Sequence, residues 1–170
     1  MKRTAITLLI LLAIAGVNTT GILADNPHFT RGPNFWDNGL TATGTGRISG
    51  LGNGDVIITI SFPNATGTTT CTNRGGNQAP GQNPGTPTSV SGTITITSVR
   101  NGTVTFSVTT NPPLNPDPVL AGCPNANWSA VFNDITFGVG TLTVQQETFH
   151  GSGVFETVLV SNVVLGDPTA

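Results

Sequence analysis

Apolar and polar residues alternate along most of the chain beyond residue 40, which is typical of β-strands with one buried and one solvent-facing side. Val56, Ile58 and Ile60, for example, alternate with Thr59 and Ser61. Together with the turn residues between the segments, this alternation predicts eight strands, over residues 40–49, 55–62, 66–72, 88–99, 103–110, 128–137, 141–149 and 154–165.

Composition supports the same fold class. The chain contains 29 threonines, many of them next to Val, Ile or Phe, and β-branched residues fit a pleated, half-buried surface. Short antiparallel strands at this spacing predict an all-β fold, an antiparallel two-sheet sandwich of immunoglobulin-like general shape. A closed β-barrel is the alternative.

Residues 100–102, Arg-Asn-Gly, are interpreted as a three-residue hairpin loop with Gly102 in the left-handed region. This loop length would pair Ile96 with Phe106 and keep the apolar sets of both strands on one face. In the last strand, consecutive apolar residues predict either burial on both faces or a bulge near Ser161 and Asn162.

The first 24 residues have the features of a secretory signal peptide: a basic start, an apolar run and a small residue, Ala24, before the expected cleavage site. Cleavage after Ala15 would leave a very short signal and is the less favoured alternative. We expect residues 25–170 to form a single secreted β-sandwich domain, because 146 residues suffice for one core.

Charge limits the partners of this domain. Residues 25–170 contain four Arg, no Lys, six Asp and two Glu, for a formal charge of −4. Nucleic acids and anionic membranes are bound mainly by clustered Lys and Arg, so neither is expected as a partner. Apolar runs after residue 24 do not exceed four residues, which predicts no integral membrane segment after signal cleavage.

The two cysteines, Cys71 and Cys123, lie at the edges of two long segments rich in Pro, Gly and Asn, over residues 73–87 and 111–127. An even pair in an exported chain predicts a disulfide, and closing a loop of about 53 residues stabilises by about 4 kcal/mol. A reactive thiol or a metal-binding pair is the alternative, but neither cysteine has a His or an acidic cluster beside it. Because bonded cysteines have Cα atoms within about 7 Å, both loops should emerge at the same end of the sandwich.

These cysteine segments also carry a resemblance. Three segments resemble a recurrent group of small secreted bacterial proteins with the pattern C-x-N-x-G-G-N, N-G and C-P-N. They are the residues from Cys71 to Pro84, the dipeptide Asn101-Gly102 and the segment from Cys123 to Trp128. The resemblance covers about residues 60–145. It implies a bacterial source, export, a disulfide and a β fold, and it supplies no catalytic residues because the group has no established activity.

Candidate catalytic residues are few. His150 and Ser152 lie in a His-Gly-Ser-Gly turn between two predicted strands, whereas a nucleophile elbow requires a strand followed by a helix, so a Gly-rich hairpin turn is favoured. Two carboxylates could form a glycosidase pair, and nothing in their spacing brings two together. Asp134 interrupts an apolar strand and would need a partner if buried. The carboxylates considered are Asp55, Asp117, Asp134, Glu147 and Glu156.

Metal ligands are equally sparse. The segments 53–55, Asn-Gly-Asp, and 115–117, Asn-Pro-Asp, offer oxygen atoms without the regular acidic spacing of a Ca²⁺ loop. We therefore expect no metal site, no cofactor and no catalytic residue.

The sequence thus predicts a secreted, non-enzymatic binding or structural module whose partner is an extracellular protein or a glycan, with a polysaccharide hydrolase as the alternative. Exposed Trp residues bring a large contact area at small entropic cost, so Trp36 and Trp128 are candidate contacts, although either could instead be a core residue. The predicted binding surface lies at the disulfide-joined loops and comprises Asn73, Arg74, Asn77, Gln78, Gln82, Asn83 and Trp128.

Overall fold

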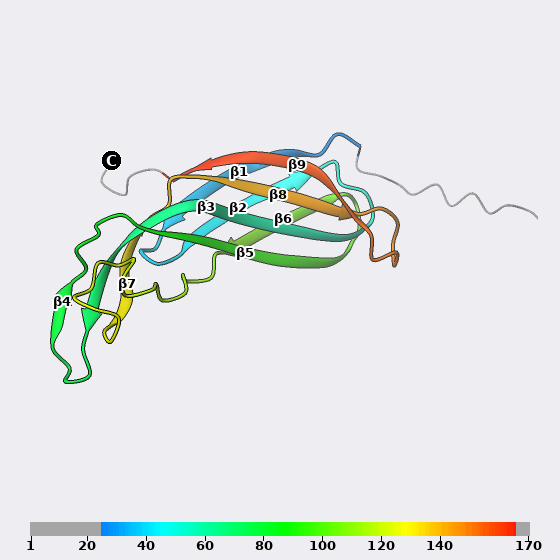
Figure 1. The fold of residues 1–170 in the computed structure, drawn as a ribbon. Helices are drawn as coiled ribbons and strands as arrows, with labels where there is room; N and C mark the ends of the chain where they lie inside the picture. Colours follow the sequence, from blue (N-terminus) through cyan, green and yellow to red (C-terminus); the bar gives the residue numbers. More distant parts are fainter. Residues whose placement is uncertain (1–24, 166–170) are drawn as a thin grey trace, which may run out of the picture.

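The computed structural model describes residues 25–165, which form an all-β sandwich of two antiparallel sheets (Figure 1). The predicted signal peptide lies outside these residues. The strands are β1 His28–Asp37, β2 Ala42–Ser49, β3 Gly54–Thr72, β4 Gln78–Pro80, β5 Thr86–Val99, β6 Thr103–Thr109, β7 Ser129–Thr136, β8 Val139–Glu147 and β9 Phe155–Val164.

The smaller sheet has the order β1-β2-β6, and the larger contains the other six strands. The sheets do not close into one another, so the sandwich prediction is confirmed and the barrel alternative is wrong. Within residues 25–165, no helix is long and apolar enough to cross a membrane.

Strand β3 is the central strand of the larger sheet, because it pairs with four of the other strands. It pairs with β5 along one edge and with β8 and then β7 along the other, so Thr59 is opposite both Thr93 and Thr143. Its second half extends beyond the double layer, where Figure 1 shows it beside β4 and β7 at one end of the molecule. The two strands predicted over 55–62 and 66–72 are therefore one strand. Pro63 and Asn64 form a bulge within it instead of a turn.

One core lies between the sheets. Ile58, Ile60 and Phe62 of β3 are fully buried, and they belong to the same cluster as Ile48 of β2 and Val108 of β6. Burial of each side chain of this kind contributes about 1.5–3 kcal/mol. The alternation read from the sequence thus assigns the core-facing side of these strands correctly.

The predicted hairpin between β5 and β6 is wrong. Ile96 of β5 pairs with Val56 of β3, and Phe106 of β6 pairs with Gly46 of β2, so the loop over residues 100–102 crosses from one sheet to the other. Gly102 has the expected left-handed conformation, with φ of 62°. The apolar side chains of β5 and β6 still face the core, because strands in opposing sheets can direct side chains inward as readily as strands that pair with each other.

The bulge in the last strand lies at Val158 and not near Ser161. Val144 pairs with Leu159 and the next residue, Gln145, pairs with Thr157, which leaves Val158 as the extra residue. Val158 and Leu159 both pack against the core as a result. Their consecutive apolar positions are explained by this single bulge, while Val160 is exposed.

Candidate functional site

The disulfide between Cys71 and Cys123 is confirmed. The two Cα atoms are 5.7 Å apart, and Cys71 at the end of β3 is fully buried. Backbone hydrogen bonds also join the two loops: the N–H groups of Gln82 and Asn83 donate to the carbonyls of Gly122 and Ala121, both at 3.3 Å. The Nδ2 atom of Asn83 donates to the carbonyl of Leu120 at 3.0 Å. The two loops thus form one structure at one end of the sandwich.

Part of the predicted binding surface at this end is committed to the loops themselves. Asn73 Oδ1 accepts hydrogen bonds from the N–H groups of Gly75 and Asn77, both at 2.9 Å, which shapes the turn between β3 and β4. Gln82 Nε2 donates to the carbonyl of Pro80 at 3.2 Å. With the Asn83 bond, three of the seven predicted side chains therefore serve loop geometry.

The other predicted residues remain available to a ligand. Arg74, Asn77 and Gln78 are exposed around the turn between β3 and β4, and Trp128 is half-buried just before β7. These residues form a small, mainly polar surface at the disulfide-joined loops.

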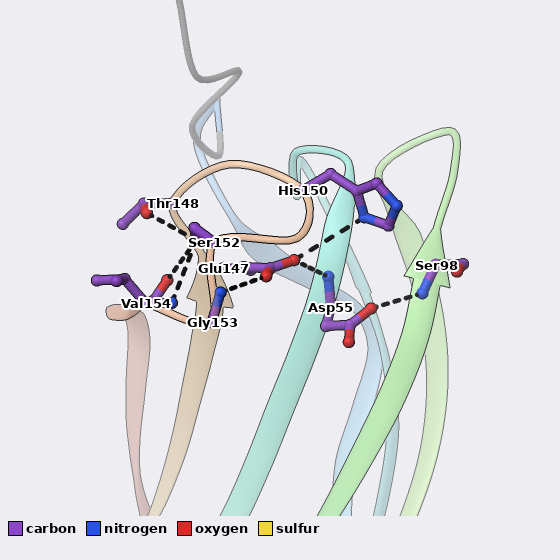
Figure 2. Close-up of polar contacts among 8 residues, drawn as sticks. All are labelled: Asp55, Ser98, Glu147, Thr148, His150, Ser152, Gly153 and Val154. Carbon is purple, nitrogen blue, oxygen red and sulfur yellow. Dashed lines mark hydrogen bonds and ion pairs between the residues drawn. The ribbon is translucent and has the colours of Figure 1, made fainter. Parts of the chain in front are cut away.

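The opposite end of the sandwich holds a cluster that the sequence did not reveal (Figure 2). Asp55 at the start of β3, Glu147 at the end of β8 and His150 in the following turn place one ligand-type atom each within 4.8 Å of one another. His150 Nδ1 lies 3.9 Å from Glu147 Oε2. Asp55 and Glu147 are far apart in sequence, and only the pairing of β3 with β8 brings them together.

Glu147 organises the turns at this end. Its side chain is 5% exposed, Oε1 accepts the N–H of Gly153 at 2.8 Å, and Oε2 accepts the N–H of Asp55 at 3.4 Å (Figure 2). The backbone N–H of Gly153, and then that of Gly151, lowers the pKa of Glu147 below its ordinary value. Glu147 is therefore an ionised acceptor at neutral pH.

A depression of about 440 Å³ adjoins this cluster and is lined by residues 53–54, 98–101 and His150. Asp55 Oδ1 accepts the N–H of Ser98 at 2.8 Å, so this carboxylate also fixes a turn. The three side chains offer two carboxylates and an imidazole of the kinds that divalent metals bind. The hydrogen bonds of the two carboxylates show what they do in the fold, which is to join the β8–β9 turn, the start of β3 and the end of β5.

The His-Gly-Ser-Gly turn does not assemble a nucleophile. Ser152 Oγ accepts the N–H of Val154 at 3.1 Å and lies 3.3 Å from Thr148 Oγ1, whereas His150 is directed toward Glu147 (Figure 2). The interpretation as a Gly-rich turn between strands agrees with this geometry.

The remaining candidate carboxylates are dispersed. Asp117 Oδ1 accepts the N–H of Val119 at 2.7 Å within its own loop. Asp134 is exposed at a bulge in β7, so it needs no buried partner, and Glu156 is exposed on β9. Of the five carboxylates, the structure brings together Asp55 and Glu147.

The outer face of the smaller sheet is a second surface of interest. Trp36 of β1 is 49% exposed on this face, because its neighbour Phe35 packs against the core. Trp36 is opposite Thr43 of β2, which is opposite Thr109 of β6, and the two Thr Oγ1 atoms are 2.8 Å apart. The next row consists of Asn34, Thr45 and Ser107. An exposed indole thus borders two rows of uncharged hydrogen-bonding side chains.

Comparisons with protein-family models, with curated proteins and with solved structures find no match to this chain. The function must therefore be inferred from the chain's own geometry.

Proposed function

We propose that the chain is a secreted, non-enzymatic binding module that holds a glycan on the outer face of the sheet β1-β2-β6. The observation that carries this proposal is the exposure of Trp36 beside the Thr43–Thr109 and Asn34–Thr45–Ser107 rows. An indole face stacks on the apolar face of a sugar ring, and hydroxyl and amide groups exchange hydrogen bonds with sugar hydroxyls. These groups lie on a paired sheet, so little ordering is needed on binding.

Export is part of the same proposal. The signal-like segment at residues 1–24 supports it, and the Cys71–Cys123 disulfide is compatible with an oxidising compartment. The resemblance of the cysteine segments to secreted bacterial proteins supports the same location.

The hydrolase alternative has weaker support from the carboxylate geometry. A glycosidase needs one carboxylic acid with a raised pKa to protonate the leaving group, but the pKa of Glu147 is lowered. Asp55 and Glu147 also accept backbone N–H groups that fix the surrounding turns. Binding without turnover is therefore the function that the arrangement favours.

Glycan binding is tested with the two tryptophans as a matched pair. Residues 25–170 are expressed with the disulfide intact, and binding to soluble plant and bacterial cell-wall polysaccharides is measured by affinity electrophoresis and calorimetry. We expect Trp36→Ala to weaken binding about tenfold or more, which corresponds to about 1.4 kcal/mol, and Trp128→Ala to leave it unchanged. Loss confined to Trp128→Ala and Arg74→Ala would move the site to the disulfide-joined loops.

Turnover is measured on the same polysaccharides by the release of reducing ends. We expect none from the wild type. Release that disappears in Asp55→Asn, with the fold intact by circular dichroism, would replace the binding proposal with the hydrolase.

A further inference from the structure

Two arginines face each other on the same outer face that carries Trp36. Arg31 of β1 pairs directly with Arg47 of β2, and both side chains are exposed. They line a depression of about 320 Å³ together with Thr30 and Thr105. Four Arg and no Lys occur in residues 25–170, so half of the cationic side chains of this part of the chain gather at one point.

This pairing is electrostatically unfavourable by itself. Like charges directly opposite each other on antiparallel strands destabilise the sheet. Neither arginine forms an ion pair within residues 25–165. Strands β2 and β6 contain no acidic residue, and the one in β1, Asp37, uses Oδ1 to accept the N–H of Gly39 at 2.8 Å. No acidic side chain of this sheet is therefore paired with Arg31 or Arg47.

We propose that Arg31 and Arg47 form a site for an oxyanion of the bound glycan, a carboxylate or a sulfate ester, so that the ligand is an acidic polysaccharide. Guanidinium groups bind both anions through paired N–H donors in a planar fork. The hydroxyl of Thr105 lines the same depression and can donate to a remaining oxygen, whereas the hydroxyl of Thr30 donates to the carbonyl of Arg47 at 3.4 Å. This inference rests on the proposed function, because it names the chemical class of the glycan.

The spacing along β2 indicates a chain and not a single sugar. Thr43, opposite Trp36, and Arg47, opposite Arg31, are four residues apart. At about 3.4 Å per residue, the stacking row and the arginine row are separated by about 14 Å. A short acidic oligosaccharide lying along β2 can contact both. Two arginines on a domain of net negative charge are too few for the many phosphate contacts that tight nucleic-acid binding uses.

The test compares polysaccharides that share a backbone and differ chiefly in charge. Polygalacturonate is paired with its methyl-esterified form, and dextran sulfate with neutral dextran, and binding is measured at low and high NaCl concentration. We expect the acidic member of at least one pair to bind more tightly, with an affinity that falls as salt rises. Preference within the first pair identifies a carboxylate, and preference within the second a sulfate ester.

Variants locate the effect. Arg31→Gln and Arg47→Gln should each weaken binding of the acidic polysaccharide by about fivefold or more, since hydrogen bonds to charged groups exceed neutral ones in strength. Arg100→Gln makes the same charge change at an exposed position in the loop between β5 and β6 and should leave the affinity unchanged. Equal losses in all three variants would indicate a general charge effect and overturn the site.

Two further results separate this inference from the proposed function. If acidic and neutral polysaccharides bind equally, and Arg31→Gln and Arg47→Gln change nothing while Trp36→Ala abolishes binding, the glycan module stands and the oxyanion site is wrong. If no polysaccharide binds, NMR titration with sodium sulfate tests the oxyanion site by itself. Chemical-shift changes at the Nε–H signals of Arg31 and Arg47 would support an oxyanion site without the glycan. Unchanged signals would overturn the oxyanion site. Single-stranded DNA bound as tightly as the acidic polysaccharide would overturn the assignment to a glycan.

Discussion

Leu51 and Gly102 join two turns at the end of the sandwich that carries Glu147: the N–H of Leu51 donates to the carbonyl of Gly102 at 3.0 Å. Gly102 has φ of 62°, and a Cβ atom at this position would overlap the carbonyl oxygen of Leu51. The turn from β2 and the crossing from β5 to β6 are therefore packed backbone against backbone.

Gly102→Val should destabilise the fold by at least about 1 kcal/mol, since a β-branched residue is poorly tolerated at positive φ and this one also meets Leu51. Urea denaturation monitored by circular dichroism measures the loss. Gly85→Ala is the control, because Gly85 has open space around its Cβ position. Equal stability of Gly102→Val and the wild type would contradict the contact with Leu51.

Alternation predicted which side of each strand faces the core but not which strand lies beside it. Ile96 and Phe106 face the core as expected, yet they belong to different sheets. Hydrophobic pattern encodes burial, and a loop with a left-handed glycine can either turn a hairpin or cross between layers. Strand β1 was missed because Gly32 and Pro33 interrupt its pattern, and register shifts on both sides of Arg31 accommodate that interruption.

The candidate sites show the same limit. The Cys71–Cys123 bond followed from cysteine count and export alone, because only one pairing exists. The opposition of Arg31 and Arg47 needs both the presence of β1 and its irregular register, so no sequence signal specified it. Trp36 was named as a candidate from its residue type, but its position opposite Thr43 depends on β1, the strand that the sequence did not predict.

The backbone of β5 at Gly92 lies against the backbone that follows β6, which gives a second stability prediction. A Cβ atom at Gly92 of β5 would overlap the carbonyl of Thr109 and lie 2.7 Å from the Cα of Thr110. The N–H of Asn111 also donates to the carbonyl of Ser91 at 2.8 Å, which links the layers at this point. Gly92→Ala should therefore destabilise by about 1–3 kcal/mol, the usual cost of overpacking.

Ser91→Ala is the matched control for Gly92→Ala, since Ser91 is exposed and its backbone bond to Asn111 is kept. Thermal unfolding of both variants at neutral pH makes the comparison. A melting temperature of Gly92→Ala as high as that of Ser91→Ala would show that the layers can separate here without cost.

Glu147 predicts a dependence of stability on pH. Its pKa is lowered in the folded state from an ordinary value of about 4.5, first by the N–H of Gly153. The folded protein therefore binds fewer protons at this group than the unfolded chain, and stability rises with pH through this range. The contribution is fully present above about pH 4.5 and is lost as the pH falls through the lowered value.

Glu147→Gln should accordingly lower the melting temperature at pH 7, and the difference from the wild type should shrink at pH 3. Glu156→Gln removes the same charge from an exposed position on β9 and should show a much smaller effect at both pH values. A deficit of Glu147→Gln that stays constant between pH 7 and pH 3 would contradict the role of the ionised carboxylate.

The disulfide should stabilise the loops without supporting the proposed glycan site. Cys71 lies outside the main hydrophobic cluster, and the bond joins residues 52 apart in the sequence, for which loop closure predicts about 4 kcal/mol. Intact mass should be two hydrogens below that of the thiol form, and reduction should lower the melting temperature.

Reduction should leave the proposed glycan site intact, because Trp36 lies on the outer face of the smaller sheet and Cys71 belongs to the larger one. Below its new melting temperature, the reduced protein should therefore keep its β-sheet circular dichroism and its affinity for polysaccharide. The variant Cys71→Ser/Cys123→Ser provides the same comparison without reductant. Loss of binding in this variant, with circular dichroism unchanged, would place the ligand at the disulfide-joined loops and not beside Trp36.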